Sequence, residues 1–147
     1  MGNLVPQDFG NALGGYCNFV MKTNKVFQYE DSEFMAEKLK DFTKELGMHL
    51  VTAMPPIQFA SGLIGIHLVI AESHIIPYIY PCGRWYFDIF TCGKKVDFPV
   101  AVRFLTTAFG ATHFSHPVED LVGIGMLEEQ GPENVELFPV EQYATAV

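Results

Sequence analysis

Three strand-like runs follow one another through the middle of the chain, and the short gaps between them limit the possible topologies. The runs are Met48–Met54, Gly62–Ala71 and Trp85–Thr91. Parallel neighbours need a crossover of a dozen or more residues, commonly helical, whereas antiparallel neighbours need only a turn. The second run is almost continuously apolar, which is typical of a strand buried on both faces. The pattern therefore favours hairpins and predicts an antiparallel or mixed sheet.

Two amphipathic helices flank these strands, because apolar residues recur at spacings of three and four. The apolar positions are Met35, Leu39, Phe42, Leu46, and then Phe98, Val102, Leu105, Phe109. Ser32 is the expected N-cap of the first helix, and Gly47 and Gly110 end the two helices. Short strands are predicted at Tyr16–Met21, Thr112–Ser115 and Leu121–Leu127. We predict an α/β (α+β) fold, a two-layer sandwich with its helices on one face of the sheet.

The 147 residues are expected to form one domain. An irregular N-terminal segment is predicted at about residues 1–15. Residues 128–147 contain five glutamates and neither lysine nor arginine. That composition predicts an exposed, partly ordered acidic tail.

The charge balance argues against two classes of partner. The net charge is -8 at pH 7, and binding to nucleic acid or to anionic membranes draws on lysine and arginine. No apolar run reaches the ~18 residues of a membrane-spanning helix, and the first residues lack the regions of a signal peptide. We expect a cytoplasmic protein with no nucleic-acid or membrane partner. The acidic balance is compatible with a cationic substrate, but such a balance is more often simply that of a soluble surface.

Cysteine and histidine spacing does not predict a metal site. Cys17, Cys82 and Cys92 form no C-x-x-C pair, and their odd number argues against a disulfide framework. His113 and His116 lie three residues apart, but in a segment predicted as strand or turn. A chance pair is the favoured interpretation, and no metal is expected.

Polar residues gather where the central strands end. Glu72-Ser73-His74 follows one strand, and Cys92 follows the last. Antiparallel neighbours joined in this way place Ser73 and Cys92 close together, so a hydroxyl and a thiol could face one pocket. Ser73, a histidine and Asp88 could also form a hydrolase triad, but the G-x-S-x-G elbow that presents such a serine is missing.

The sequence around these residues resembles the bacterial S-adenosylmethionine decarboxylases. AESHIIPYIYP and FDIFTCG are similar to the family's Ala-Glu-Ser-His strand end and Asp-x-x-Thr-Cys-Gly strand. The likeness is clearest from Phe59 to Gly93 and extends loosely over about residues 16–127. It implies a small-molecule substrate, a homodimer or higher homo-oligomer, and a decarboxylase that supplies aminopropyl groups for spermidine.

The resemblance also implies that the chain makes its own cofactor. The Ser73 hydroxyl would attack the Glu72 carbonyl, and elimination would cut the chain and leave a pyruvoyl group derived from Ser73. That group takes the substrate amine and serves as an electron sink during loss of carbon dioxide. Cys92 matches the family's proton donor. The catalytic candidates are therefore Ser73, Cys92, Glu72 and His74.

Several positions match or depart from the family's substrate and processing residues. Phe59 matches an aromatic that stacks on adenine, and Tyr80 stands where the family has tryptophan. Tyr78, a third candidate substrate contact, occupies the position of the processing histidine. Gly65 replaces a serine that assists processing, and Cys82 replaces a glutamate expected to hold the ribose.

These departures leave three interpretations open. The first is a self-processing decarboxylase of S-adenosylmethionine, with His67 or His74 as the substitute base. The second is a pyruvoyl-dependent decarboxylase of ornithine or arginine, which fits the lost ribose ligand and the acidic balance. The third is an unprocessed family member that binds a ligand or partner, or turns over S-adenosylmethionine by other chemistry.

Overall fold

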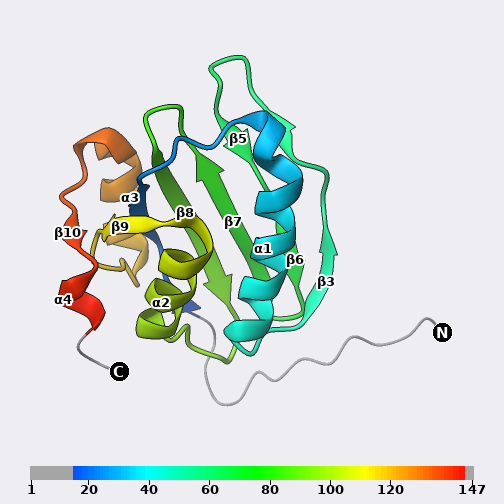
Figure 1. The fold of residues 1–147 in the computed structure, drawn as a ribbon. Helices are drawn as coiled ribbons and strands as arrows, with labels where there is room; N and C mark the ends of the chain where they lie inside the picture. The colour runs from blue at the N-terminus through cyan, green and yellow to red at the C-terminus, as the bar shows by residue number, and fades with distance from the viewer. Residues whose placement is uncertain (1–14, 145–147) are drawn as a thin grey trace.

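Antiparallel strands form the centre of the molecule (Figure 1). The computed structural model describes residues 15–144, so the predicted irregular segment before residue 15 lies outside the described residues. The long central strands are β2 (Phe19–Thr23), β7 (Ser73–Ile79), β8 (Arg84–Thr91) and β9 (Ala111–Phe114). The shorter strands are β1 (Gly15–Tyr16), β3 (Leu50–Ala53), β4 (Ile57–Gln58), β5 (Ile64–Gly65), β6 (Leu68–Ile70) and β10 (Phe138–Pro139).

The strand order is β10-β9-β2-β8-β7-β5-β4, and every paired neighbour is antiparallel. β1 pairs with β8, and β6 bridges β7 to the edge strand β3. The predicted preference for hairpins over crossovers is confirmed for the central strands. Their pairing brings the end of β6, the start of β7 and the end of β8 together, and this is where the candidate residues lie.

Two helices, α1 (Ser32–Glu45) and α2 (Phe98–Phe109), cover one face of the sheet (Figure 1). The eight predicted apolar positions point to the sheet, and all but the partly buried Phe98 are buried. Asp31 precedes α1, so Ser32 is its first helical residue and not its N-cap. Gly110 ends α2 with a φ of 67°, a conformation that glycine adopts without strain. The predicted two-layer arrangement is confirmed for these elements.

Aromatic side chains fill the space between the helices and the sheet. Trp85 and Phe87 of β8 are fully buried. The Phe87 ring stacks on Phe19 of β2 at 4.8 Å between ring centroids and meets Phe42 of α1 edge-on at 6.0 Å. Alternation along β8 sends these rings to the helix side and leaves Asp88 on the opposite face. The core therefore fixes the register that orients the polar residues of β8.

Two strand predictions around β7 need correction. Residues Gly62–Ala71 form two short strands, β5 and β6, and are not buried on both faces, because Val69 is 38% exposed. Sequence periodicity also missed β7, which pairs with β5, β6 and β8. Ser73 is therefore the first residue of a strand that follows a tight turn.

The predicted strand at Leu121–Leu127 is wrong, since these residues begin helix α3 (Leu121–Gln130). The Asp120 side chain accepts a hydrogen bond from the Gly123 N–H and caps the helix. Leu127 packs with Val20 and Tyr86, and α3 lies on the sheet face opposite α1 and α2 (Figure 1). One helix thus lies on the face that was predicted to carry none.

The acidic C-terminal segment is folded as far as residue 144. After α3 come a 3-10 turn (Pro132–Asn134), strand β10 and the short helix α4 (Glu141–Ala144). β10 pairs with β9, and the Tyr143 ring meets Phe98 edge-on. Its glutamates face solvent while a few apolar side chains attach the segment to the domain. Within residues 15–144, no helix has the length and apolar composition that a membrane crossing requires.

Candidate active site

A two-residue hairpin turn presents the Glu72–Ser73 peptide bond. Ile70 of β6 pairs with Ser73 of β7, so Ala71 and Glu72 form the turn between them. On the other side Ser73 pairs with Thr91, the last residue of β8. The predicted proximity of Ser73 to the end of this strand is confirmed.

Cys92 contacts this peptide bond through its backbone. The Cys92 N–H donates a 2.7 Å hydrogen bond to the carbonyl oxygen of Glu72. This is the carbonyl that the Ser73 hydroxyl would have to attack. A donor already in place on that oxygen would stabilise negative charge developing there.

Ser73 has a strained backbone. Its φ is 148°, and it is the one non-glycine residue among residues 15–144 with a positive φ. L-residues rarely adopt this region, and such conformations cost about 1–3 kcal/mol each unless the surroundings hold them in place. The hairpin pairing and the Cys92 hydrogen bond supply that constraint.

A chain of polar contacts leads away from the Ser73 hydroxyl. Its Oγ lies 3.4 Å from Nδ1 of His74, and Nε2 of His74 lies 3.4 Å from Oδ1 of Asp88. The hydrogen bond with His74 lowers the pKa of Asp88, although burial opposes the shift. Ser73, His74 and Asp88 therefore lie in the order of a triad, although the missing G-x-S-x-G elbow argued against one.

Asn18, which the sequence analysis did not predict as a site residue, contacts Asp88 at the end of this series of polar contacts. Its amide nitrogen donates to the Tyr86 hydroxyl at 2.9 Å and to Asp88 at 3.3 Å, while its oxygen accepts from the Ile89 N–H. The side chain is almost fully buried. Asn18 lies between strands β1 and β2, at a break that the sequence pattern did not indicate.

The Glu72 side chain points to a different partner. Its carboxylate is 2% exposed and accepts hydrogen bonds from the N–H of His49 at 3.1 Å and from Nδ1 of His49 at 2.8 Å. The Glu72 carbonyl thus belongs to the peptide bond with Ser73, while the Glu72 carboxylate binds His49 in the segment that leads into β3.

Two of the candidate substrate residues line a groove of about 310 Å³ beside this chain of contacts. Tyr78 and Tyr80 share its lining with Tyr86, Asp88 and residues of α3. Burial raises the pKa of Tyr78 and Tyr80, and raises that of Tyr86 to about 12. The groove therefore presents neutral phenols together with the carboxylates of Asp88 and Glu128.

The third substrate candidate, Phe59, lies close to Gly65, the residue that replaces the family's processing serine. A Cβ built on Gly65 would lie 3.5 Å from the Phe59 ring and 3.3 Å from Nε2 of His67. The His67 ring also meets Tyr78 edge-on at 6.1 Å. His67 therefore fills the space beside Gly65, while the Ser73 hydroxyl has His74 as its histidine neighbour.

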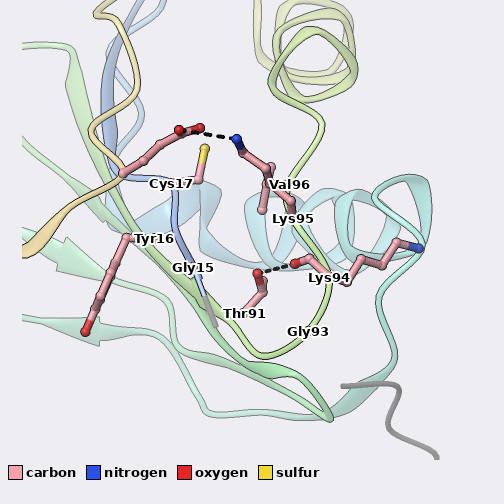
Figure 2. A pocket seen from close by; sticks show the side chains of 9 residues that line it. Gly15, Tyr16, Cys17, Thr91, Gly93, Lys94, Lys95 and Val96 are labelled. Atoms are coloured by element: carbon pink, nitrogen blue, oxygen red, sulfur yellow. Dashed lines mark hydrogen bonds and ion pairs between the residues drawn. The ribbon is translucent and has the colours of Figure 1, made fainter. Parts of the chain in front are cut away.

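A second pocket lies beyond the end of β8 (Figure 2). Its volume is about 290 Å³, and an ion pair between Lys95 and Glu119 lies beside it. Burial, with Glu119 nearby, raises the pKa of the lining Cys17 thiol to about 12. A thiol that stays protonated is a poor nucleophile, so Cys17 is not a candidate nucleophile of this pocket.

The remaining cysteines and His116 do not come together in one cluster within the described residues. Cys82 is exposed, Cys92 is partly buried, and no cysteine of the described part forms a disulfide. His116 stacks on Phe138 and contacts the Tyr143 hydroxyl, so it holds the C-terminal segment. Across the described residues, no group of three His, Cys, Asp or Glu side chains could hold a metal ion.

Comparisons with known proteins agree on one family. A sequence model described as S-adenosylmethionine decarboxylase matches residues 23–118. S-adenosylmethionine decarboxylase proenzymes of Pseudomonas paraeruginosa and Pseudomonas aeruginosa are each 28% identical to this chain over 85 residues, or 57% of it. The matched region is 52% of each proenzyme, so the chain spans about half the length of these curated relatives.

A solved structure shows the same fold. The crystal structure of the adenosylmethionine decarboxylase from Aquifex aeolicus matches with a TM-score of 0.57 at 19% sequence identity. The match covers 74% of this chain and 89% of that one. At this identity the likeness concerns the arrangement of sheet and helices.

The strain at Ser73 predicts different stabilities for two variants that both lack the hydroxyl. Glycine tolerates a φ of 148° and alanine does not, so Ser73→Gly should be more stable than Ser73→Ala by about 1 kcal/mol. Urea unfolding of the two purified variants measures the difference. An alanine variant as stable as the glycine variant would contradict the strained backbone.

Proposed function

Because this chain belongs to the S-adenosylmethionine decarboxylase family, we propose that it is a self-processing, pyruvoyl-dependent carboxy-lyase acting on S-adenosylmethionine. One observation carries the proposal: the Glu72–Ser73 bond lies in a strained turn, with Cys92 on the carbonyl and His74 beside the hydroxyl. The curated relatives are named as proenzymes, which supports processing of this chain.

The first step would move the acyl group of Glu72 from nitrogen to oxygen. His74 takes the proton from the Ser73 hydroxyl as its Oγ attacks the Glu72 carbonyl carbon, and Asp88 stabilises the charged imidazole. The Cys92 N–H stabilises the oxyanion. The carbon–nitrogen bond then breaks, the nitrogen takes the proton, and an ester joins Glu72 to Ser73.

The second step would cut the chain without net oxidation or reduction. Removal of the Ser73 α-proton expels Glu72 as a carboxylate and leaves a carbon–carbon double bond. Tautomerisation and hydrolysis with one water release ammonia and leave a terminal pyruvoyl group. The whole sequence consumes one water, and cutting also ends the backbone constraint at Ser73.

The residues around Ser73 fit a pyruvoyl group at that position, because the turn, the hydroxyl and the carbonyl donor are all present. When present, the group supplies a carbonyl that accepts the substrate amine and withdraws electrons as carbon dioxide leaves. Cys92 would return a proton to the substrate carbon. The product would be an aminopropyl donor for spermidine.

The groove beside Asp88 would hold the substrate. Tyrosine faces and a carboxylate attract a cation such as a sulfonium group. Phe59 is 42% exposed, which leaves a ring face free to stack on adenine. The same groove would accept the cationic side chain of ornithine or arginine, and the exposed Cys82 offers no carboxylate to hold a ribose. A decarboxylase of those amino acids is therefore the second candidate.

We also propose that the chain forms a homodimer through the sheet face opposite α1 and α2. α3 and the segment after it pack on this face through Leu127 and Val135. Toward the β3 edge several apolar side chains are exposed. They are Val51, Met54, Ile57, Phe59 and Val69. Since the candidate substrate residue Phe59 belongs to this set, a second copy would lie next to the site.

His74 and Tyr78 give opposite expectations for the cut. Loss of a general base costs at least about a hundredfold in rate, so His74→Ala should slow cutting by that factor. Tyr78→Phe removes the hydroxyl at the family's processing position and should leave the rate unchanged. Intact-mass time courses after cell-free synthesis measure both. Slowing by Tyr78→Phe alone would assign the base to Tyr78.

Release of labelled carbon dioxide tests the substrate. The purified chain should decarboxylate carboxyl-labelled S-adenosylmethionine in preference to labelled ornithine and arginine, and Ser73→Ala should abolish the release. Preference for either amino acid would select the second candidate. A chain that stays uncut and releases nothing, yet binds S-adenosylmethionine in calorimetry, would select the unprocessed interpretation.

A further inference from the structure

We propose that His49 is a positioning residue for the cut: it holds the Glu72–Ser73 bond in place by anchoring the Glu72 side chain. The inference rests on the proposed function, because it concerns the self-processing step. His49 lies after the Gly47 turn that ends α1, next to the start of β3. Nothing in the sequence pattern connects it with Ser73.

The Glu72 carboxylate depends on His49. It is 2% exposed, and both of its hydrogen-bond donors, the N–H and Nδ1, belong to that residue. Removing a carboxylate from water is costly unless charge-assisted hydrogen bonds replace the lost hydration. Without the imidazole, one backbone N–H would remain, and the side chain would gain by turning toward solvent.

The backbone of the turn is attached to the same residue. The Ala71 N–H donates to the His49 carbonyl at 2.8 Å, while the Glu72 carbonyl accepts from Cys92 on the opposite side. The turn is thus held between the β3 edge and the end of β8. These attachments fix Glu72 on both sides, and they help to maintain the unusual φ of Ser73.

His49 acts on the reaction through Glu72. Its imidazole contacts the carboxylate, whereas the Ser73 hydroxyl has His74 as its neighbour. The side chain of His49 is 55% exposed, so substitutions there leave no cavity in the core. Its expected contribution is the geometry of the attacked carbonyl and not proton transfer.

Three variants separate the hydrogen bond from the mere presence of a side chain. The amide nitrogen of His49→Asn falls near the position of Nδ1, whereas that of His49→Gln falls near Nε2, and His49→Ala supplies neither. Each chain is made by cell-free synthesis and followed by intact mass. Wild type and His49→Asn should be cut at similar rates, and the other two about tenfold more slowly or worse.

The outcomes distinguish this inference from the proposed function. A wild-type chain that is never cut would contradict both the proposed self-processing and the role of His49. A wild-type chain that is cut while all three variants keep its rate would remove the role of His49 alone. Slow cutting in His49→Asn as well as in His49→Gln would also overturn the hydrogen-bond account. Thermal unfolding controls for folding, and if His49→Ala fails to fold, the asparagine–glutamine pair decides.

Discussion

The hydrogen bond from the Cys92 N–H to the Glu72 carbonyl holds together the two backbone segments that form the candidate site. It is the point where the β6–β7 hairpin turn meets the end of β8. The antiparallel register, fixed by buried rings such as Phe87, brings these two backbone segments together. The packed core therefore places a donor on one carbonyl and holds Ser73 in a conformation that a free chain would avoid.

If the chain processes itself as proposed, residues of the same sheet would take over from the family's missing processing helpers. Tyr78 and Gly65 leave two processing helpers unfilled, yet His74 lies beside the Ser73 hydroxyl and is supported by Asp88 and Asn18. Asp88 needs the alternation of β8 to face His74, because side chains one residue away point into the core. On that proposal, the processing residues would be one that follows the serine directly and one on the neighbouring strand.

Sequence patterns predicted the helix-backed sheet because the apolar periodicity of α1, α2 and β8 is strong. They failed at α3, where an evenly apolar run has no helical stripe and the Asp120 cap was overlooked. Motif spacing placed Ser73 near Cys92, since strand pairing follows from short connections. Asn18 and His49 could not be found in this way, because their importance arises from contacts between residues distant in sequence.

The intact mass of the freshly purified wild-type chain decides whether the chain cuts itself between Glu72 and Ser73. With self-processing, the 16.4 kDa chain should separate into two fragments of nearly equal mass. The second fragment would be lighter by one ammonia than the product of simple hydrolysis between Glu72 and Ser73. A single mass, that of the uncut chain, persisting over days would contradict self-processing. A second fragment that still carries the amino group of Ser73 would indicate ordinary proteolysis instead.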